Sequence, residues 1–306
     1  MGLTLAGAAF PSILLKGSHL LPGEKVSYEI YKPTPDQWNT NELNMAWIGH
    51  STVLINIYGK IILTDPVLFN SIGLYILGAT IGKIRATAPA LEFDEIPKPD
   101  IVLLSHSHMD HMDYKSLKEL TDKFPGDINC VTAFNTKDII DDLKWKTLRE
   151  LDWDKTINFD ELKIKAIEVN HDGFRFPGER DRAEGHVLDG RSYSGYILES
   201  NGKNVLFAGD TAYTEIFTKY KYENIDVAIM PIGGYVPHHH RHCNPEEALI
   251  MASEHMEAKY FVPIHCNTFD GDEGFHTPID WMMKSADKYQ IKIGLSDIGE
   301  TLIITS

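Results

Sequence analysis

The sequence predicts an α/β fold, and two observations lead to this class. Short apolar runs that are typical of buried strands recur along the chain from Met45 onward. Stretches with helix-start patterns, such as Asn244-Pro245, alternate with these runs. Strands interleaved with helices are characteristic of α/β proteins. The 306 residues are enough for one large domain or two small ones.

The first elements along the chain are an irregular lead-in and a pair of strands. Residues 1–44 are rich in proline and glycine breakers, so we expect an N-terminal arm there and one domain over residues 45–306. Thr52–Ile57 places Val53, Ile55 and Ile57 on one face, which predicts a strand. Gly59-Lys60 then predicts a turn into a second strand over residues 61–64.

Helices are expected after several strands. Asn244 followed by Pro245 combines an N-cap residue with proline at the first helical position. Thr277-Pro278 repeats this pattern. The apolar, glycine-broken residues 72–84 are instead expected to form a loop or a short helix near the mouth of a pocket. The expected helices cover residues 114–120, 136–143, 244 to about 257, and 281–289.

Composition limits the class of partner. The chain has 29 Lys and Arg residues against 44 Asp and Glu residues, a formal net charge of −15. A nucleic-acid groove needs a basic stripe, so nucleic acid is not an expected partner. The charge also argues against electrostatic binding to anionic lipid, although a locally basic region is compatible with a negative net charge of the whole chain. Membrane contact and oligomeric state therefore stay open.

Cysteine usage and the N-terminus bear on the compartment. Three cysteines do not predict a disulfide framework, and a reducing, cytoplasmic compartment fits better, with peripheral membrane association as an alternative. The apolar residues 2–15 lack a basic flank and are too short to span a bilayer. We expect a packed arm there, rather than an export signal or a surface anchor.

The most informative motif, H-x-H-x-D-H, begins at His106, directly after the apolar run Ile101–Leu104. Imidazole suits zinc, iron or manganese, and a carboxylate adds the charge to hold a second cation. His106 and His108 can point the same way in an extended chain, whereas Asp110 and His111 lie past the bend and can face a neighbouring metal. The motif therefore predicts a metal site, against the alternative of a histidine-rich surface turn.

Three further strand ends carry possible ligands. His171, Asp210 and His265 each follow an apolar run. A lone histidine at a strand end is more often a satisfied polar residue, but these three in this order after the motif are hard to attribute to chance. Cys266 is a possible soft ligand, although the adjacent His265 is the better candidate.

These motifs resemble those of the metallo-β-lactamase superfamily, and the resemblance extends from Trp47 to the C-terminus. It implies a four-layer αββα sandwich with two divalent cations at its edge, zinc being favoured over manganese or iron. Asp65 is similar to the superfamily's buried aspartate, which implies that it orients a ligand rather than binding metal. The implied ligands are His106, His108 and His171 for the first metal, Asp110, His111 and His265 for the second, and Asp210 as the bridge.

Further blocks are similar to the N-acylphosphatidylethanolamine-hydrolysing phospholipase D group and to related ascorbate-6-phosphate lactonases. They include Trp47-Ile48-Gly49-His50 and the segments 207–211, 242–248 and 264–269. The resemblance implies a phosphodiesterase that uses a metal-bridging hydroxide on a small-molecule or phospholipid-like diester. A lactonase or other ester hydrolase is one alternative, and a metal-loaded binding or sensor protein without turnover is another.

Other residues are candidates for catalysis or substrate binding. Asp110 is the catalytic candidate among the ligands, and His242 is the best one outside them, since it could donate to a phosphate or leaving group. His50 is expected near the metals as an outer donor. Tyr235 could hydrogen-bond a substrate oxygen or pack in the core. The charged residues 174–191 are either a lid with substrate-binding arginines or a solvated loop.

Overall fold

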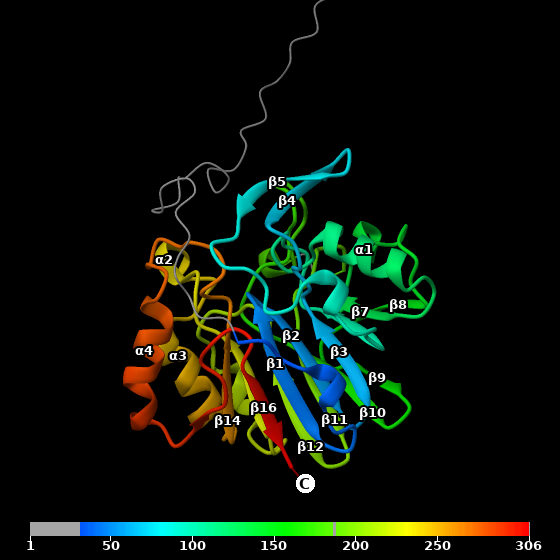
Figure 1. Ribbon diagram of the computed structural model, residues 1–306. Coiled ribbons are helices and arrows are strands. Elements are labelled where there is room, and N and C mark those ends of the chain that lie inside the picture. Colours follow the sequence, from blue (N-terminus) through cyan, green and yellow to red (C-terminus); the bar gives the residue numbers. More distant parts are fainter. Residues whose placement is uncertain (1–30, 186–187, 306) are drawn as a thin grey trace, which may run out of the picture.

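Two seven-stranded sheets pack against each other in the computed structural model, which describes residues 31–185 and 188–305 (Figure 1). Buried apolar residues of both sheets form one continuous cluster. Helix α1 (Tyr114–Lys123) lies beside one sheet, and helices α3 (Pro245–Ile250) and α4 (Thr277–Ser285) lie beside the other (Figure 1). The expected α/β class and the four-layer αββα sandwich are therefore confirmed.

The first sheet is built mainly from the N-terminal half of the chain and is mixed. Its first strands pair in antiparallel fashion, whereas the later ones are parallel. The last strand of the chain closes the edge beside the first strand. In spatial order the strands are β16 (Thr301–Ile304), β1 (Leu43–Gly49), β2 (Thr52–Ile57), β3 (Lys60–Thr64), β6 (Ile101–Leu104), β7 (Asn129–Ala133) and β8 (Thr147–Leu151).

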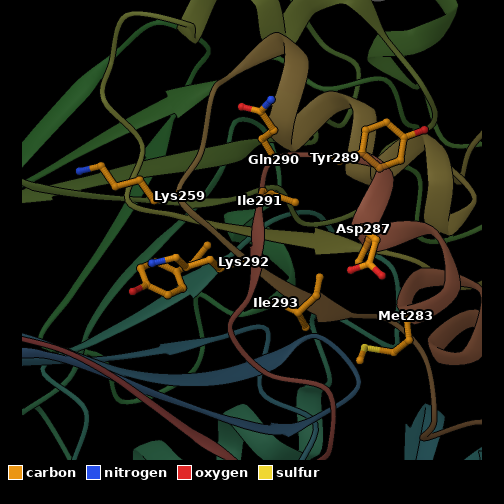
Figure 2. Close-up of a pocket in the computed structure, with 10 residues that line it drawn as sticks. Lys259, Met283, Asp287, Tyr289, Gln290, Ile291, Lys292 and Ile293 are labelled. Atoms are coloured by element: carbon orange, nitrogen blue, oxygen red, sulfur yellow. The ribbon is translucent and has the colours of Figure 1, made fainter.

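The second sheet has the same mixed character. Four strands at one edge are parallel, and the other pairs are antiparallel. In spatial order the strands are β15 (Lys292–Ile293), β14 (Tyr260–Ile264), β13 (Val227–Pro231), β12 (Lys203–Phe207), β11 (Gly195–Ser200), β10 (Leu162–Ile167) and β9 (Thr156–Phe159). A surface groove of about 740 Å³ lies along the edge strand β15, and its lining includes none of the candidate site residues (Figure 2).

Helix starts follow the capping patterns of the sequence. Asn244 accepts a hydrogen bond from Glu247 N at 3.0 Å, and the Glu247 carboxylate accepts one from Asn244 N at 2.9 Å, which closes a capping box at α3. The helix continues as a π-helix over Met251–His255. Helix α4 starts at Thr277, before the expected residue 281. The remaining short helices are α2 (Tyr235–His238) and the 3-10 helices Pro35–Gln37, Phe93–Glu95, Lys137–Ile139, Arg182–Glu184, Glu215–Tyr220 and Ala286–Lys288.

Residues 72–84 form a β-hairpin, so the prediction of a loop or short helix there is wrong. The strands are β4 (Ser71–Ile76) and β5 (Ala79–Ile84), which pair only with each other. Gly73 and Gly82, which in the sequence are typical of breaks in regular structure, pair with each other across the hairpin. A Cβ atom on Gly73 would lie 2.3 Å from the carbonyl oxygen of Ile81, and Gly82 is equally restricted. Glycine is therefore needed here for close strand approach.

The expected helix over residues 136–143 is also wrong, because only a 3-10 turn forms there. The carbonyl oxygen of Ile140 accepts from the indole of Trp145 at 3.0 Å and from Leu143 N at 3.3 Å, contacts that differ from the i to i+4 bond of a longer helix. The Glu150 carboxylate accepts the N–H groups of Thr136 and Lys137 at 2.8 and 3.0 Å. Tertiary contacts thus override the helical spacing of the apolar residues.

The start of the chain is described only in part. The apolar residues 2–15 lie outside the described residues, as does most of the expected arm over residues 1–44, and β1 begins at Leu43. Among the described residues, no helix is long and apolar enough to cross a membrane. The three cysteines are free and buried.

Candidate metal centre

The histidine motif lies in a tight loop that joins β6 to α1. The N–H groups of His111 and Met112 both donate to the carbonyl oxygen of His108, at 3.1 and 2.8 Å, which closes a turn. Before the turn, Ser105 N donates to the Asp65 carboxylate at 2.8 Å. The side chains of the motif therefore project from a fixed backbone.

The first group of side chains comprises His106, His108 and His171. His106 Nε2 lies 2.9 Å from His108 Nδ1, which lies 3.4 Å from His171 Nε2. Two nitrogens on one tetrahedral zinc are about 3.4 Å apart, since each Zn–N bond is about 2.0–2.1 Å. The outer nitrogen of His171 lies 2.9 Å from the carbonyl oxygen of Arg241, which fixes the ring. The three rings are therefore spaced as ligands of one cation.

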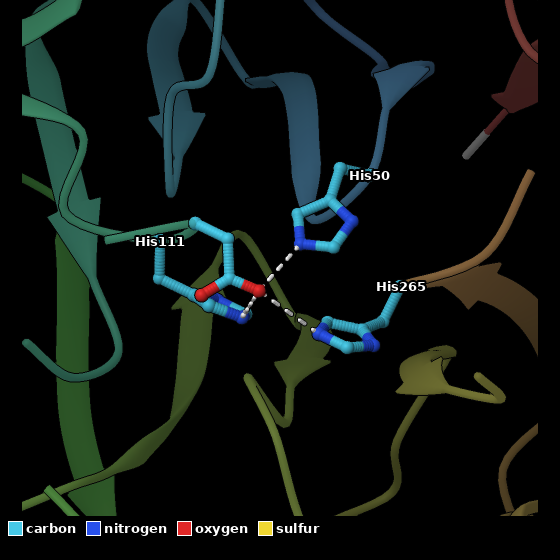
Figure 3. Close-up of side chains that lie close together, drawn as sticks. His50, His111 and His265 are labelled. Carbon is cyan, nitrogen blue, oxygen red and sulfur yellow. Dashed lines mark hydrogen bonds and ion pairs between the residues drawn. The ribbon is translucent and has the colours of Figure 1, made fainter. Parts of the chain in front are cut away.

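The second group comprises Asp110, His111 and His265, together with His50 (Figure 3). Asp110 Oδ2 lies 3.2 Å from His50 Nε2, 3.5 Å from His265 Nε2 and 3.8 Å from His111 Nε2. The rings of His50 and His265 are 4.4 Å apart. The structure thus places His50 among the other members of this group, rather than behind them.

Asp210 stands between the two groups. Its Oδ2 atom lies 3.0 Å from His111 Nε2 and 3.1 Å from His265 Nε2, both in the second group. The same oxygen lies 3.9 Å from His171 Nε2 in the first group. The side chain is buried. A carboxylate oxygen within reach of both groups is placed to bridge two cations.

Several inward-facing atoms of the centre have no hydrogen-bond partner within the described part of the chain. These buried atoms are His111 Nε2, His265 Nε2, His242 Nδ1 and Asp210 Oδ1. Buried polar atoms without hydrogen bonds are rare, because burial removes their hydration, and His111 Nε2 and His265 Nε2 here instead face Asp210 Oδ2 at 3.0 and 3.1 Å. Each of them can offer a lone pair to zinc, manganese or iron. The residues present therefore fit a centre for divalent cations.

The protonation of the histidines follows from burial and the two carboxylates. Burial disfavours a charged imidazole, but Asp210 and Asp110 outweigh it at two rings, raising the pKa of His265 to about 9 and that of His111 well above its usual range. Burial and the neighbouring histidines hold the pKa of His106 well below its usual value. Without a cation, His111 and His265 are therefore protonated near neutral pH.

Asp65 orients the histidines from outside the centre. Its Oδ2 atom lies 2.7 Å from His111 Nδ1 and accepts a 2.5 Å hydrogen bond from Ser105 Oγ. Ser105 Oγ in turn lies 2.9 Å from His106 Nδ1. One buried carboxylate and one hydroxyl thus reach the outer nitrogen of a histidine in each group. Such contacts set the tautomer and direction of a metal-binding ring.

His242 enters the centre from the loop before α3. Its Nδ1 atom lies 3.6 Å from Asp210 Oδ2, and its ring stacks on His265 at 5.0 Å. Gly234, at φ +80°, leaves the necessary space, because a Cβ atom there would lie 3.2 Å from His242 Nδ1. Burial lowers the pKa of His242 well below its usual value. The ring is therefore neutral near pH 7 and can donate a hydrogen bond or offer a lone pair.

Tyr235 contacts the side chain of Trp281 on helix α4. Its ring meets Trp281 edge-on at 5.9 Å, and the residue is buried. Burial raises the pKa of the Tyr235 hydroxyl to about 12. This contact favours the packing role over the substrate-binding one.

Asp172 and Arg241, which no sequence motif singles out, lie beside the first group. Asp172 Oδ1 is 3.3 Å from His108 Nε2, and its Oδ2 is 2.7 Å from Arg241 Nε. Burial opposes ionisation of Asp172, but the neighbouring His108 and His171 outweigh it and lower its pKa to about 2. An ionised carboxylate behind a histidine fixes the ring. The only available sequence signal is that Asp172 directly follows His171.

The arginines of residues 174–191 pair with groups of the protein itself, some within this segment and some outside it. Arg175 Nη1 donates to the carbonyl oxygens of Ser107 and Met112, at 2.8 and 3.0 Å, and so braces the motif loop. These contacts favour a fixed loop over a lid with substrate-binding arginines, within the part of this segment that the structure describes. The other pairs are Arg180 with Asp189, Arg182 with Asp152, and Arg191 with Asp138 and Glu179.

Comparison with known proteins gives relatives over most of the chain. The model of the beta-lactamase superfamily domain matches residues 60–266. A mitochondrial N-acyl-phosphatidylethanolamine-hydrolyzing phospholipase D of Saccharomyces cerevisiae is 29% identical over 264 residues, which cover 80% of this chain and 52% of that protein. This chain thus spans about half the length of the yeast relative.

Two further similarities come from prokaryotes. A metal-dependent hydrolase of Anoxybacillus flavithermus is 29% identical over 231 residues, covering 74% of this chain and 87% of that protein. The solved structure of a metallo hydrolase from the archaeon Ignicoccus hospitalis superposes with a TM-score of 0.62 at 19% identity, covering 86% of this chain and 99% of the other. The structural likeness establishes the fold alone.

Proposed function

Because this chain belongs to the metallo-β-lactamase superfamily, we propose that it is a metal-dependent hydrolase that cleaves a phosphodiester. The observation that carries the proposal is the buried Asp210 carboxylate, which lies within reach of both groups of histidines. The name of the Anoxybacillus relative supports metal-dependent hydrolysis. The name of the yeast relative supports a diester of the phospholipid kind.

The proposed centre holds two divalent cations, and zinc suits a set of imidazoles and carboxylates. When bound, two such cations lower the pKa of water and stabilise negative charge on a phosphoryl oxygen. His50 is placed to serve as a further ligand of the second group. The proposed ligands are His106, His108 and His171 for one cation, Asp110, His111 and His265 for the other, and Asp210 between them.

The chain's own side chains would position the reaction. Asp65 holds His111 with its Nε2 atom turned towards Asp210, so little reorganisation is needed when substrate arrives. His242, neutral and beside the bridge, is placed to donate a hydrogen bond to a non-bridging phosphate oxygen or to the leaving oxygen. Asp172 keeps the His108 ring in one orientation.

The test is an assay of the metallated protein on three kinds of substrate. We expect turnover of bis(p-nitrophenyl) phosphate and of phospholipid diesters with differing tail lengths. A panel of lactones tests the rival ester hydrolase, in which attack occurs at a carbonyl carbon. Hydrolysis of lactones without hydrolysis of diesters would replace the proposal by that rival. Stoichiometric metal binding without turnover of either class would indicate a binding or sensor protein.

A further inference from the structure

The β4–β5 hairpin projects from the end of the molecule that also carries α1 and α2 (Figure 1). Its exposed side chains are mainly aliphatic. The exposed fraction is 48% for Ile76, 102% for Leu77, 61% for Ile81 and 73% for Ile84. Exposed aliphatic residues gathered on one projecting element indicate an interaction surface.

The tip of the hairpin carries an unusual residue. Leu77 and Gly78 form the two-residue turn between β4 and β5, with φ angles of +52° and +85°. Turns with two such angles favour Asn-Gly or Gly-Gly, because a larger side chain is strained in the left-handed region. Leu77 is fully exposed, so folding gains nothing from its apolar side chain. Its presence there points to a contact outside the folded chain.

The two faces of the hairpin differ in what they meet. The ring of Tyr75 lies 5.5 Å from that of Tyr114 at the start of α1, so this face turns towards the body of the protein. Alternate residues of a strand point to opposite faces. Ile76 and Leu74, with Ile81 as the cross-strand partner of Leu74, therefore turn away from the body.

The base of the hairpin is joined to the rim of the metal centre. Ala86 N donates to the carbonyl oxygen of Thr268 at 2.8 Å. The guanidinium of Arg85 lies 6.0 Å from the centre of the Phe269 ring, which meets the His50 ring edge-on at 5.0 Å. The base of the hairpin is therefore fixed beside the second group, and the tip projects up to about 20 Å from this base, because each strand has six residues that rise about 3.3 Å each.

The local charge of this region is opposite to that of the whole chain. Residues 66–91 contain no Asp or Glu, although the chain has a net charge of −15. The same stretch includes Lys83, which is exposed on β5, whereas Arg85 is buried and donates to the carbonyl oxygens of Val67 and Thr87. A surface that combines aliphatic side chains with an exposed lysine, in a stretch without acidic residues, fits an anionic lipid bilayer, because the bilayer offers both acyl chains and negative headgroups.

We propose that the β4–β5 hairpin docks this protein on an anionic lipid bilayer. Leu77 and Ile76 enter the interfacial region, and Lys83 lies at the headgroups. Docking turns the end of the molecule at which the base of the hairpin meets the rim of the metal centre towards the lipid surface, where a phospholipid-like diester is found. The docking itself requires no turnover, so it is tested independently of the proposed hydrolysis.

The test is co-sedimentation of the full chain with vesicles of phosphatidylcholine and phosphatidylglycerol. We expect the wild type to bind, and binding to weaken roughly tenfold or more in the double variant Ile76→Ser, Leu77→Ser, because two aliphatic side chains no longer leave water. Lys83→Gln should weaken binding to these vesicles but not to pure phosphatidylcholine. The matched control is Leu188→Ser, which removes an aliphatic side chain that is 87% exposed outside the hairpin.

A second measurement reports on the tip directly. The variant Ile76→Cys can be labelled selectively with an environment-sensitive dye, because the three native cysteines are buried. A blue shift on addition of the mixed vesicles is expected. The proposal would be overturned if the wild type does not bind the vesicles, or if the double variant binds them as tightly as the wild type. It would also be overturned if Leu188→Ser weakens binding as much as the double variant does. A concentration-dependent dimer that the double variant abolishes, without vesicle binding, would assign the hairpin to a second copy of the chain instead.

Discussion

Asp172 joins Arg241 to the first group of histidines through its two carboxylate oxygens. One oxygen lies 2.7 Å from Arg241 Nε, and the other lies 3.3 Å from His108 Nε2. The guanidinium therefore restrains the carboxylate, which in turn restrains the ring. His108 faces the other members of the group through Nδ1, so the Nε2 contact decides which nitrogen is free to bind a cation.

Asp172→Asn should lower the affinity for metal by about 10- to 100-fold, as loss of an outer carboxylate does at other metal-binding histidines. Arg241→Gln should have a smaller effect in the same direction, since the carboxylate remains. Competition with a chromophoric chelator measures both affinities. Unchanged affinity in Asp172→Asn would show that the carboxylate does not control the His108 ring.

The wild type should bind two divalent cations per chain, and Asp210→Ala should abolish nearly all hydrolysis while leaving a folded protein. The reason is that Asp210 supports both groups, whereas the apolar core is separate from it. Elemental analysis after equilibration with excess zinc or manganese, with circular dichroism as the folding control, provides the check. Saturation of the wild type at one cation would contradict the dinuclear centre.

His242→Ala should reduce turnover roughly a hundredfold or more and retain both cations, because it removes a hydrogen-bond donor to the substrate. His242→Gln keeps a donor and should lose less. The loss should be smaller with a nitrophenol leaving group, which needs little help in departing. A variant His242→Ala that binds only one cation would identify His242 as a ligand, in keeping with its unpartnered Nδ1 atom.

Metal binding should release protons, and the affinity should rise with pH up to about 9. The metal-free protein holds a proton on His265, whose pKa is about 9, and on His111, whereas a ligand must be neutral. Because the pKa of His265 is raised on folding, its proton stabilises the metal-free protein fully below about pH 6.5, and this stabilisation is lost as pH rises through 9. Titration calorimetry in buffers of different ionisation enthalpy counts the protons; none released at pH 7 contradicts the assignment.

Arg175→Ala should destabilise the protein by about 1–3 kcal/mol, because the buried carbonyl groups of Ser107 and Met112 lose their donor. Arg180→Ala, whose side chain is 62% exposed, should change stability by less than about 1 kcal/mol. Urea denaturation at neutral pH distinguishes the two variants. If both variants instead keep their stability and show a higher KM for an anionic substrate, the interpretation of residues 174–191 as a lid would be supported.

The residues that could be predicted from the sequence are those whose position follows from strand pattern. His171, Asp210 and His265 stand at the ends of apolar runs, and the ends of strands that run in the same direction meet at one edge of a sheet. The capping box at Asn244 could also be predicted, because its two partners lie within one helical turn of each other in the sequence. Local patterns were therefore sufficient for the class, the main strands and the ligand candidates.

Features that depend on contacts between distant segments could not be predicted. Arg241 lies beside the metal centre because it forms an ion pair with Asp172, which is far away in the sequence, and no spacing rule connects the two residues. The hairpin at residues 71–84 depends on two glycines meeting across its strands, which in sequence look like breaks. Over residues 136–143 the apolar spacing favours a helix, but only a 3-10 turn forms there, and its Ile140 carbonyl oxygen accepts from the indole of Trp145.

The metal centre is assembled from both sheets. The H-x-H-x-D-H loop follows β6 of the first sheet, whereas Asp210 and His265 follow β12 and β14 of the second. During synthesis on the ribosome, the second group stays incomplete until His265 has emerged and β14 has joined its sheet. A nascent or truncated chain thus lacks the full chelating set, and cation loading reports that the two sheets have come together.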